Sequence, residues 1–411
     1  MPTFVLATFL FVYLAMVLGR VPGLRLDRTG AALVGALVLV AAGAMTAQDA
    51  WLAVDVPTLA LLFGMMVLSA QLAAAGVYAH IARVLDAAQA GPKALLAWVV
   101  VVSGAMSAVL TNDVVCVALA PLVAEIARRR RYQPLPYLLA LAAAANVGSA
   151  LTLIGNPQNI LLGQTLQLSF GAYAVQALVP VCLGLGLTWM VIWQAWKTRV
   201  QEPATPVVSS ETAPQELPTR DRLQAVKGLT LLSLVMILFV ATELPREAVA
   251  LGAAAVALCS RRIHSQAFVT RVDWPLLVLF TSLFVVHAAF EAAGWTARLA
   301  QQLQSAHLPV DDLSTLYWLS VPLSNVVSNV PAVMLLLETG VPAALGPALA
   351  LSSTLAGNLL LVGSIANLIV AEEAQRQGLS FTWKEHARVG VPIALSTLLI
   401  AWLWLVFLAS H

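Results

Sequence analysis

Charged residues are scarce in this chain, and cysteines are scarcer still. Only 10% of the 411 residues are Asp, Glu, Lys or Arg, whereas 60% are hydrophobic; soluble domains have roughly 45–50% apolar residues. A soluble fold of this length could not bury so much apolar surface, so we expect lipid to solvate most of the chain. Three scattered cysteines exclude a disulfide framework and a structural zinc site, and each is interpreted as a small apolar residue: Cys116, Cys182 and Cys259.

Signals for catalysis and for secretion are also missing. The sequence has no His-Glu-x-x-His motif and no nucleophile with a matching base, so we expect no enzyme, no cofactor and no metal beyond a possible sodium ion. Nothing indicates nucleic-acid binding. The apolar run at 3–19 lacks a preceding basic region and a cleavage site, so we expect a retained helix instead of a signal peptide.

Apolar runs of spanning or nearly spanning length predict an all-α polytopic membrane protein with ten crossings. They lie at about 3–19, 30–46, 57–75, 134–154, 173–195, 226–241, 245–259, 274–292, 346–362 and 389–409. Two further apolar segments, 93–126 and 312–345, are each interrupted by polar residues. We interpret these two as re-entrant hairpins, which enter and leave the membrane on the same side.

The distribution of positive charge supports this topology. With both hairpins re-entrant, 20 of the 22 Lys and Arg residues fall on one side, and only Arg246 and Arg298 fall on the other. The positive-inside rule then predicts a bacterial inner-membrane protein with its basic side in the cytoplasm and both termini in the periplasm. The four arginines at 128–131 are interpreted as an anchor at the lipid headgroups.

An internal repeat divides the chain. Residues 54–76 align without a gap with 272–294, and 10 of 23 positions are identical, including an Asp-x-Pro start and an Ala-Ala-Gly end. Five crossings separate equivalent points, so the repeats face opposite ways, an architecture of secondary transporters with the site at the repeat interface. We expect a first repeat at 1–196, a cytoplasmic linker at 197–225 and a second repeat at 226–411, with broken helices at 134–165 and 346–375.

Four polar clusters lie at membrane depth and match in pairs across the repeat. They are Ser107 with Thr111-Asn112-Asp113, Gly155-Asn156-Pro157-Gln158-Asn159, Ser324-Asn325 with Ser328-Asn329, and Gly363-Ser364 with Asn367. Irregular backbone is tolerated at that depth only where it is buried in protein or lines a wet cavity. Hydroxyls, amide oxygens and free carbonyls suit a sodium ion, and helix N-termini suit an anion. Single polar residues often only join helices, but four paired clusters predict a lined site.

Asp113 is the one carboxylate in these clusters. An ionisable group inside the membrane is by default a functional candidate, here for proton coupling; the alternative is a cap bonded to backbone amides at the hairpin tip. His287 and Glu291, four residues apart, could form a second protonatable pair, but we expect them to be structural. No Lys or Arg lies in a cluster, so the substrate must be nearly neutral or balanced by bound cations and helix dipoles.

At these motifs the sequence resembles the ion transporter superfamily, which includes divalent anion:sodium symporters, citrate-transporter-like permeases, arsenite efflux pumps and sodium/proton antiporters. The residues that carry the resemblance lie at 110–113, 154–159, 328–331 and 363–367. The resemblance implies a homodimeric elevator, in which hairpins and broken helices slide as a unit against a scaffold.

The same resemblance implies two ion sites and one substrate site. The ion sites would comprise Ser107, Thr111, Asn112 and Gly155 in one half, and Ser324, Val327, Asn329 and Gly363 in the other. The substrate would contact Thr111, Asn112, Asp113, Asn156, Asn159, Ser328, Asn329, Ser364 and Asn367. Symporters of this superfamily carry Ser-Asn-Thr at both hairpin tips, and Asp113 and Val330 depart from that pattern toward the arsenite-pump branch.

The sequence therefore predicts an ion-coupled secondary transporter in the lipid bilayer that carries a small anion or oxyacid. The favoured form is a proton-coupled, arsenite-like or inorganic oxyanion permease. A sodium-coupled symporter of di- or tricarboxylates or sulfate is the alternative. A sodium/proton antiporter or a channel would be a different class, but a channel should show a continuous polar stripe on several full-length helices, and this chain shows only local interruptions.

Overall fold

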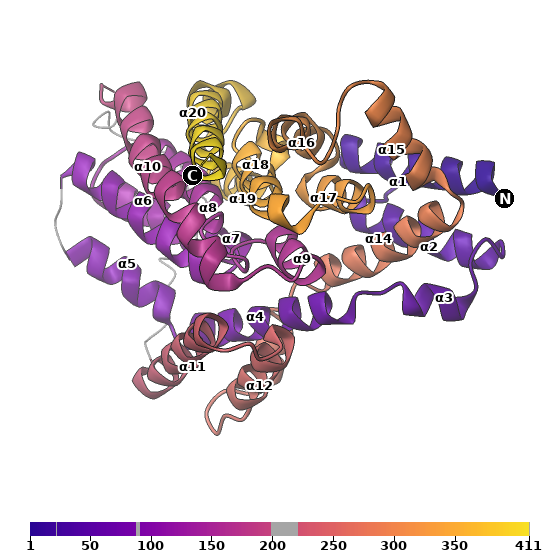
Figure 1. Cartoon of the computed structure of the whole chain (residues 1–411). Coiled ribbons are helices and arrows are strands. Elements are labelled where there is room, and N and C mark those ends of the chain that lie inside the picture. Colours follow the sequence, from indigo (N-terminus) through magenta and orange to yellow (C-terminus); the bar gives the residue numbers. More distant parts are fainter. Residues whose placement is uncertain (22, 88–90, 199–220, 411) are drawn as a thin grey trace.

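The computed structural model of the protein describes residues 1–21, 23–87, 91–198 and 221–410. These residues form twenty α-helices and two short 3₁₀-helices, and no strand is found among them (Figure 1). The first ten helices are α1 (Pro2–Leu18), α2 (Arg28–Ala41), α3 (Ala47–Leu52), α4 (Val56–Ala74), α5 (Val77–Ala87), α6 (Pro92–Val109), α7 (Asn112–Arg129), α8 (Pro134–Ser149), α9 (Pro157–Thr165) and α10 (Phe170–Trp196). The second ten are α11 (Arg222–Ala241), α12 (Arg246–Leu258), α13 (Gln266–Val269), α14 (Trp274–Ala292), α15 (Trp295–Ser305), α16 (Leu313–Val327), α17 (Asn329–Glu338), α18 (Gly346–Ala356), α19 (Ile365–Arg376) and α20 (Trp383–Ala409), with η1 (Ala343–Leu345) and η2 (Leu361–Gly363) on either side of α18.

The repeated sequence motifs begin and end equivalent helices, α4 and α14. Asp55 caps α4 by accepting a hydrogen bond from Thr58 N (3.1 Å), and Asp273 caps α14 from Leu276 N (3.0 Å). The proline of each Asp-x-Pro lies in the first helical turn, where its fixed φ fits and its missing N–H is not needed. The glycine of each Ala-Ala-Gly has a positive φ, 73° and 78°, which ends the helix.

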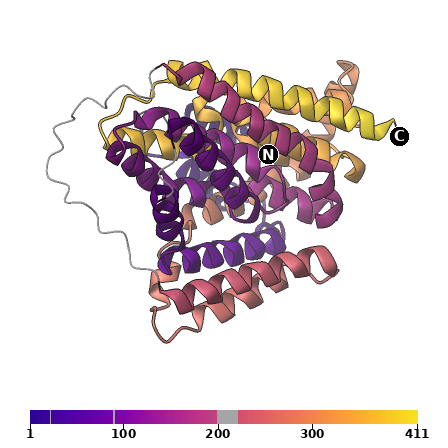
Figure 2. The same cartoon turned by 90° about the vertical axis from the view of Figure 1, so that its left-hand side faces the viewer.

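Helix order and packing also repeat between the halves. Helices α4 and α14 have 19 residues each, and α10 and α20 have 27 each. Helix α4 packs against α12 while α14 packs against α2, and α7 packs against α19 while α17 packs against α9. Helices α10 and α20 lie side by side (Figure 2). If a twofold relation connects the halves, each contact between a helix of one half and a helix of the other must occur twice with the partners exchanged, as it does here. The orientation of the halves in a membrane stays a prediction.

Six helices of the described chain are long and apolar enough to cross a bilayer: α4, α6, α10, α11, α14 and α20. Every apolar run of the sequence coincides with a helix, and both expected hairpins are pairs of helices, α6–α7 and α16–α17. The sequence did not predict α5 and α15, because these 11-residue helices are amphipathic and not uniformly apolar. Most of the expected linker, 199–220, lies outside the described residues.

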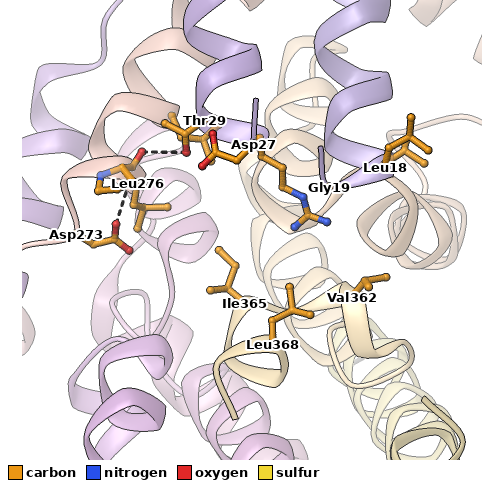
Figure 3. Close-up of a pocket in the computed structure, with 13 residues that line it drawn as sticks. Leu18, Gly19, Asp27, Thr29, Asp273, Leu276, Val362, Ile365 and Leu368 are labelled. Atoms are coloured by element: carbon orange, nitrogen blue, oxygen red, sulfur yellow. Dashed lines mark hydrogen bonds between the residues drawn. The ribbon is translucent and has the colours of Figure 1, made fainter. Parts of the chain in front are cut away.

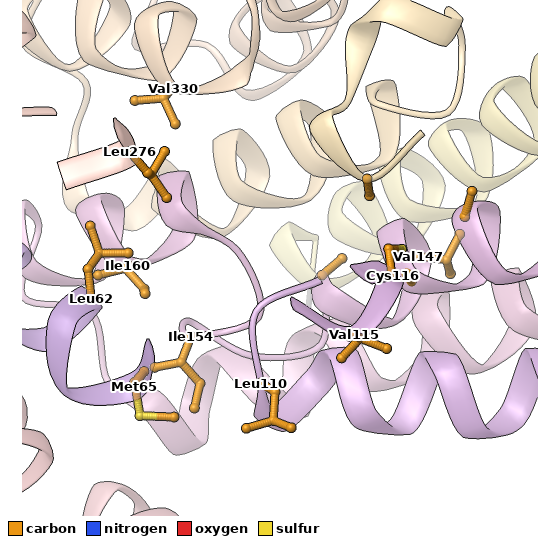
Figure 4. Packing of buried hydrophobic residues seen from close by; sticks show 14 of the residues in the cluster. Leu62, Met65, Leu110, Val115, Cys116, Val147, Ile154, Ile160, Leu276 and Val330 are labelled. Atoms are coloured by element: carbon orange, nitrogen blue, oxygen red, sulfur yellow. The ribbon is translucent and has the colours of Figure 1, made fainter. Parts of the chain in front are cut away.

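One apolar core surrounds the points where helices are interrupted. Buried side chains from α4, α7, α8 and α17 enclose these points, as Figure 4 shows for Leu62, Met65, Val115, Val147 and Val330. The surface helices carry many exposed Leu and Val residues on their outer faces, including those of α10, α11 and α20. Polar backbone is thus held inside the protein, while the outside suits lipid.

Candidate functional site

Four helix interruptions meet at one small cavity. They lie between α6 and α7, α8 and α9, α16 and α17, and α18 and α19. The cavity has a volume of about 30 Å³, and all four interruptions contribute to its wall, together with α14. Its lining residues are Asn112, Asp113, Asn156, Pro157, Gln158, Leu276, Ser328, Asn329, Val330, Gly363, Ser364 and Ile365.

Most of the residues expected at the site lie on this wall or directly behind it. Seven line the cavity: Asn112, Asp113, Asn156, Ser328, Asn329, Gly363 and Ser364. The others do not line it and are buried in the protein: Ser107, Thr111, Gly155, Asn159, Ser324, Val327 and Asn367. The structure therefore places the two sets of residues, one from each half, around one centre.

The two hairpin tips are held in different ways. Asn112 donates its backbone N–H to Gly155 O (2.9 Å), which ties the tip of the first hairpin to the α8–α9 interruption. A Cβ atom at Gly155 would lie 2.1 Å from Ser149 O, so only glycine allows this approach. In the second tip, Ser328 joins α16 to α17 with a φ of 77°. A conformation of this kind costs a non-glycine residue on the order of 1–3 kcal/mol and is typical of functional sites.

Asn146, a residue of α8 that the sequence did not single out, connects both halves of the wall. Its Oδ1 accepts hydrogen bonds from Asn112 Nδ2 (3.1 Å) and Ser364 Oγ (2.8 Å). Its Nδ2 donates to Asn358 Oδ1 (2.9 Å) and Asn367 Oδ1 (3.1 Å). All four hydrogen-bonding positions of one buried amide are thus occupied, and they join the first hairpin to the second broken helix.

Thr354 of α18 holds the α8–α9 interruption through a similar set of hydrogen bonds. Its hydroxyl accepts hydrogen bonds from Asn156 Nδ2 (3.1 Å) and Gln158 Nε2 (3.4 Å) and donates to Asn159 Oδ1 (3.2 Å). Thr354 lies 208 residues after Asn146, the same shift that aligns the two Gly-x-x-x-Asn motifs. Each half therefore supplies one polar side chain that fixes the opposite half's loop. The repeat shift was the signal in the sequence that could have revealed both residues.

Several buried oxygen atoms of the two hairpins have no hydrogen-bond partner within the described residues. In the first half they are Ser107 Oγ and Asn112 Oδ1; in the second half they are Ser324 Oγ, Asn325 Oδ1 and Asn329 Oδ1. Buried polar atoms are nearly always paired, so a set of unpaired oxygens indicates a position that a ligand completes. All but Asn325 belong to the two ion sites that the resemblance implies. The donor set, hydroxyl and amide oxygens, fits a sodium ion or the O–H groups of a substrate.

The cavity wall contains no cationic side chain among the described residues. Asp113 is the one charged residue that lines it, and Asp273 at the start of α14 acts on Asp113 electrostatically. A wider cavity of about 340 Å³ lies beside the first and shares Leu276 and Ile365 with it (Figure 3). Its wall includes Asp273 and, from the loop and start of α2, Asp27, Arg28 and Thr29.

His287 does not pair with Glu291 in the structure. Glu291 is exposed, whereas His287 is buried and contacts Glu338 at the end of α17 through Nδ1 and Tyr13 of α1 through Nε2. The sequence did not identify Glu338, because it lies 51 positions further along the chain on a different helix.

A polar cavity at the meeting point of broken helices, inside a helical protein with an apolar exterior, defines a membrane transporter. The sequence pattern of the citrate transporter family matches residues 12–346, and the chain belongs to this family. It is 30% identical to the silicon efflux transporter LSI3 of Oryza sativa subsp. japonica, over 93% of both chains. It is 24% identical to the putative transporter arsB of Dictyostelium discoideum, over 92% of this chain and 87% of that one.

The fold has a counterpart among solved structures. The YdaH transporter of Alcanivorax borkumensis superimposes with a TM-score of 0.61 at 18% identity, covering 99% of this chain and 98% of the other. The similarity supports the all-α polytopic fold predicted from the sequence. The relatives are transporters and not enzymes, in agreement with the absence of catalytic motifs.

Proposed function

We propose that this protein is an ion-coupled secondary carrier of a small neutral oxyacid, with arsenous acid and silicic acid as model substrates and the proton as the coupling ion. The observation that carries the proposal is the pair of unpartnered amide oxygens, Asn112 Oδ1 and Asn329 Oδ1, on two residues that line a cavity without a cationic side chain. Both oxygens only accept hydrogen bonds. A ligand that completes them must then donate a hydrogen bond or be a cation.

Neutral oxyacids can donate hydrogen bonds, and fully ionised sulfate or dicarboxylates without a hydroxyl group cannot. Each hydroxyl of arsenous or silicic acid can donate a hydrogen bond to an amide oxygen, whereas sulfate and dicarboxylates carry acceptors only. The cavity volume of about 30 Å³ also favours a small solute over citrate. A relative is named a silicon efflux transporter and another is named arsB, and both names agree with such a substrate.

Asp113 is proposed as the proton-coupling group. It lines the cavity beside Asn112, and it interacts with a second carboxylate, Asp273, across the two cavities. An ionisable group at membrane depth is by default a candidate for proton transfer, and a change of water access could release its proton. Binding of a proton at Asp113 and passage of the substrate would then be linked.

Sodium coupling is the second candidate, and one observation favours it. Unpaired oxygens occur at both expected ion sites, in matching positions of the two halves: Ser107 and Asn112 in one, Ser324 and Asn329 in the other. Two sodium ions at these positions could balance a bound di- or tricarboxylate or sulfate. A sodium/proton antiporter without organic substrate would use the same residues.

Transport in proteoliposomes separates these candidates. The purified protein is reconstituted, and movement of arsenite, silicic acid, sulfate and citrate is measured with a pH gradient alone and with a sodium gradient alone. We expect arsenite and silicic acid to move under the pH gradient without sodium. Strictly sodium-dependent uptake of sulfate or citrate, with no movement of either oxyacid, would contradict the proposal and favour the symporter.

We further propose that the protein works as a homodimeric elevator built from two inverted repeats in a bacterial inner membrane, with both termini in the periplasm. The hairpins and broken helices would move together past the remaining helices. Lys93 and Arg131, which are exposed at the two ends of the α6–α7 hairpin, must then lie on the cytoplasmic side. Cysteines at both positions, in a chain with Cys182 and Cys259 changed to Ser, should react only from that side. Labelling of one position from outside would rule out the hairpin.

A further inference from the structure

Three hydrogen-bonding side chains from three helices meet outside the central cavity. Tyr13 of α1 donates its hydroxyl to Pro331 O of α17 (2.9 Å), and the same hydroxyl lies 2.8 Å from His287 Nε2 of α14. His287 Nδ1 contacts Glu338 Oε1 at the other end of α17. Glu338 Oε2 also accepts a hydrogen bond from Thr296 Oγ1 of α15 (3.4 Å). The cluster therefore links α17, one arm of the second hairpin, to α1, α14 and α15.

The hydrogen positions in this cluster depend on one proton. When Tyr13 donates to Pro331 O, its oxygen must accept from His287, so Nε2 carries a hydrogen. The contact between Nδ1 and Glu338 Oε1 then contains a second hydrogen, carried by Nδ1 or by Oε1. The pair thus holds one proton more than a neutral ring beside a carboxylate. After removal of that proton, the one hydrogen of the neutral ring lies on Nδ1, where it bonds the Glu338 carboxylate. Nε2 then carries no hydrogen, so Tyr13 must donate its hydroxyl hydrogen to Nε2 and no longer to Pro331 O.

We propose that Tyr13, His287 and Glu338 form a proton-binding site, separate from Asp113, in which proton uptake fastens the second hairpin to α1 and α14. The bound proton is held between His287 and Glu338 and comes from water through Glu338, whose side chain is 16% exposed, whereas that of His287 is 3% exposed. Loss of the proton withdraws the Tyr13 hydrogen from Pro331 O, two residues after the Asn329 tip. The proposal that this event contributes to coupling rests on the carrier function proposed above.

The surrounding helices carry few other ionisable groups. On the same helices, Glu291 is exposed, and Arg298 of α15 is exposed with its guanidinium over the Trp295 ring (4.6 Å). Asp27 and Arg28 of α2 lie near the Asp273 end of α14, about 20 Å along the helix from His287. No other Asp, Glu, Lys, Arg or His occurs in α1, α9, α17 or α18. Tyr317 of α16 donates instead to Leu398 O.

Aromatic rings shield the cluster from other solvent contact. Phe9 stacks on Tyr13, with 4.2 Å between ring centroids, and on Phe290 at 3.9 Å, and its edge contacts the His287 ring. The repeat places Ser69 at the position of His287, so the first half has no titratable group there. The proton site is therefore a feature of the second half alone, and it distinguishes one hairpin from the other.

Hydrogen exchange of α17 as a function of pH tests this site without any substrate. Backbone amide exchange of peptides covering 328–342 is measured by mass spectrometry on the purified protein at several pH values between about 6 and 8.5 and is corrected for intrinsic rates. We expect α17 to exchange about tenfold more slowly at the low pH than at the high pH, as one charge-assisted contact predicts. In His287→Gln this pH response should disappear.

Matched variants make the test decisive. Glu338→Gln, which keeps the side-chain shape, should also lose the response, and it replaces His287→Gln if that variant does not fold. Tyr13→Phe should show fast exchange at both pH values, because Pro331 O has no donor. Glu291→Gln, one turn from His287 and exposed, should behave as wild type. A wild-type pH response in both His287→Gln and Glu338→Gln, or none in the unmodified protein, would overturn the proposal. Because no transport is measured, the result is independent of the substrate and of Asp113.

Discussion

Replacement of Asn146 by Ala should damage the central site more than the replacement of any single Asn or Gln that lines the cavity. The change removes two hydrogen bonds that Asn146 accepts and two that it donates. Four buried groups on Asn112, Ser364, Asn358 and Asn367 lose a partner, at about 1 kcal/mol each if a water molecule enters the space. The expected loss of stability is about 4 kcal/mol, and transport should fall with it because the first hairpin and the second broken helix are no longer joined.

Thermal unfolding of the detergent-solubilised protein measures this effect. For a chain of this size about 4 kcal/mol corresponds to a decrease of roughly 5 °C in the unfolding midpoint. Thr188→Ala is a matched control, since the Thr188 hydroxyl is buried but bonds only to Gly184 O of its own helix (2.8 Å). An Asn146→Ala protein as stable as Thr188→Ala, and with normal transport, would refute the role given to the amide network.

Three further predictions concern the cavity itself. Asn112→Leu and Asn329→Leu should each abolish arsenite and silicic acid transport while the protein remains folded and inserted, because each removes an unpartnered acceptor; normal uptake rates in either variant would remove the proposed substrate contact. Asp113→Asn should eliminate transport driven by a pH gradient while allowing substrate exchange at equal pH, which a counterflow assay detects; an unchanged pH response would assign proton coupling elsewhere. Gly155→Ala should distort the α8–α9 interruption, and with it the hydrogen bond of Gly155 O to the hairpin tip, because its Cβ would lie 2.1 Å from Ser149 O of α8; a variant with wild-type unfolding midpoint and uptake would contradict that packing.

The sequence predicted the helices and their interruptions because both depend on local composition. Long apolar runs require helices in lipid, and a polar cluster with proline or glycine interrupts such a helix at a predictable place. The Asp-x-Pro and Ala-Ala-Gly motifs of the repeat also have local roles, as the start and end of α4 and α14. The amphipathic helices α5 and α15 were not predicted, because their apolar residues occupy only one face.

The contacts behind the cavity could not be predicted in the same way. Asn146 bonds to residues more than 200 positions away, and the Thr354 hydroxyl bonds to the opposite half, so these partners are defined only when the halves pack together. His287 contacts Glu338 of another helix and not Glu291, which lies one turn further along its own helix. Spacing along one helix therefore could not predict this partner either. The resemblance placed the expected ion and substrate residues at the same interruptions, and seven of the fourteen line one cavity in the structure.

Location of arsenic in the protein would test the central claim most directly. Crystals of a variant with Cys116, Cys182 and Cys259 changed to Ser, which removes thiols that arsenite could bind, are soaked in arsenite, and anomalous differences at the arsenic edge are mapped. We expect one peak in the cavity, within hydrogen-bonding distance of Asn112 Oδ1 and Asn329 Oδ1. A peak only elsewhere in the protein, or none in the cavity at concentrations that saturate transport, would contradict a neutral-oxyacid site at this centre.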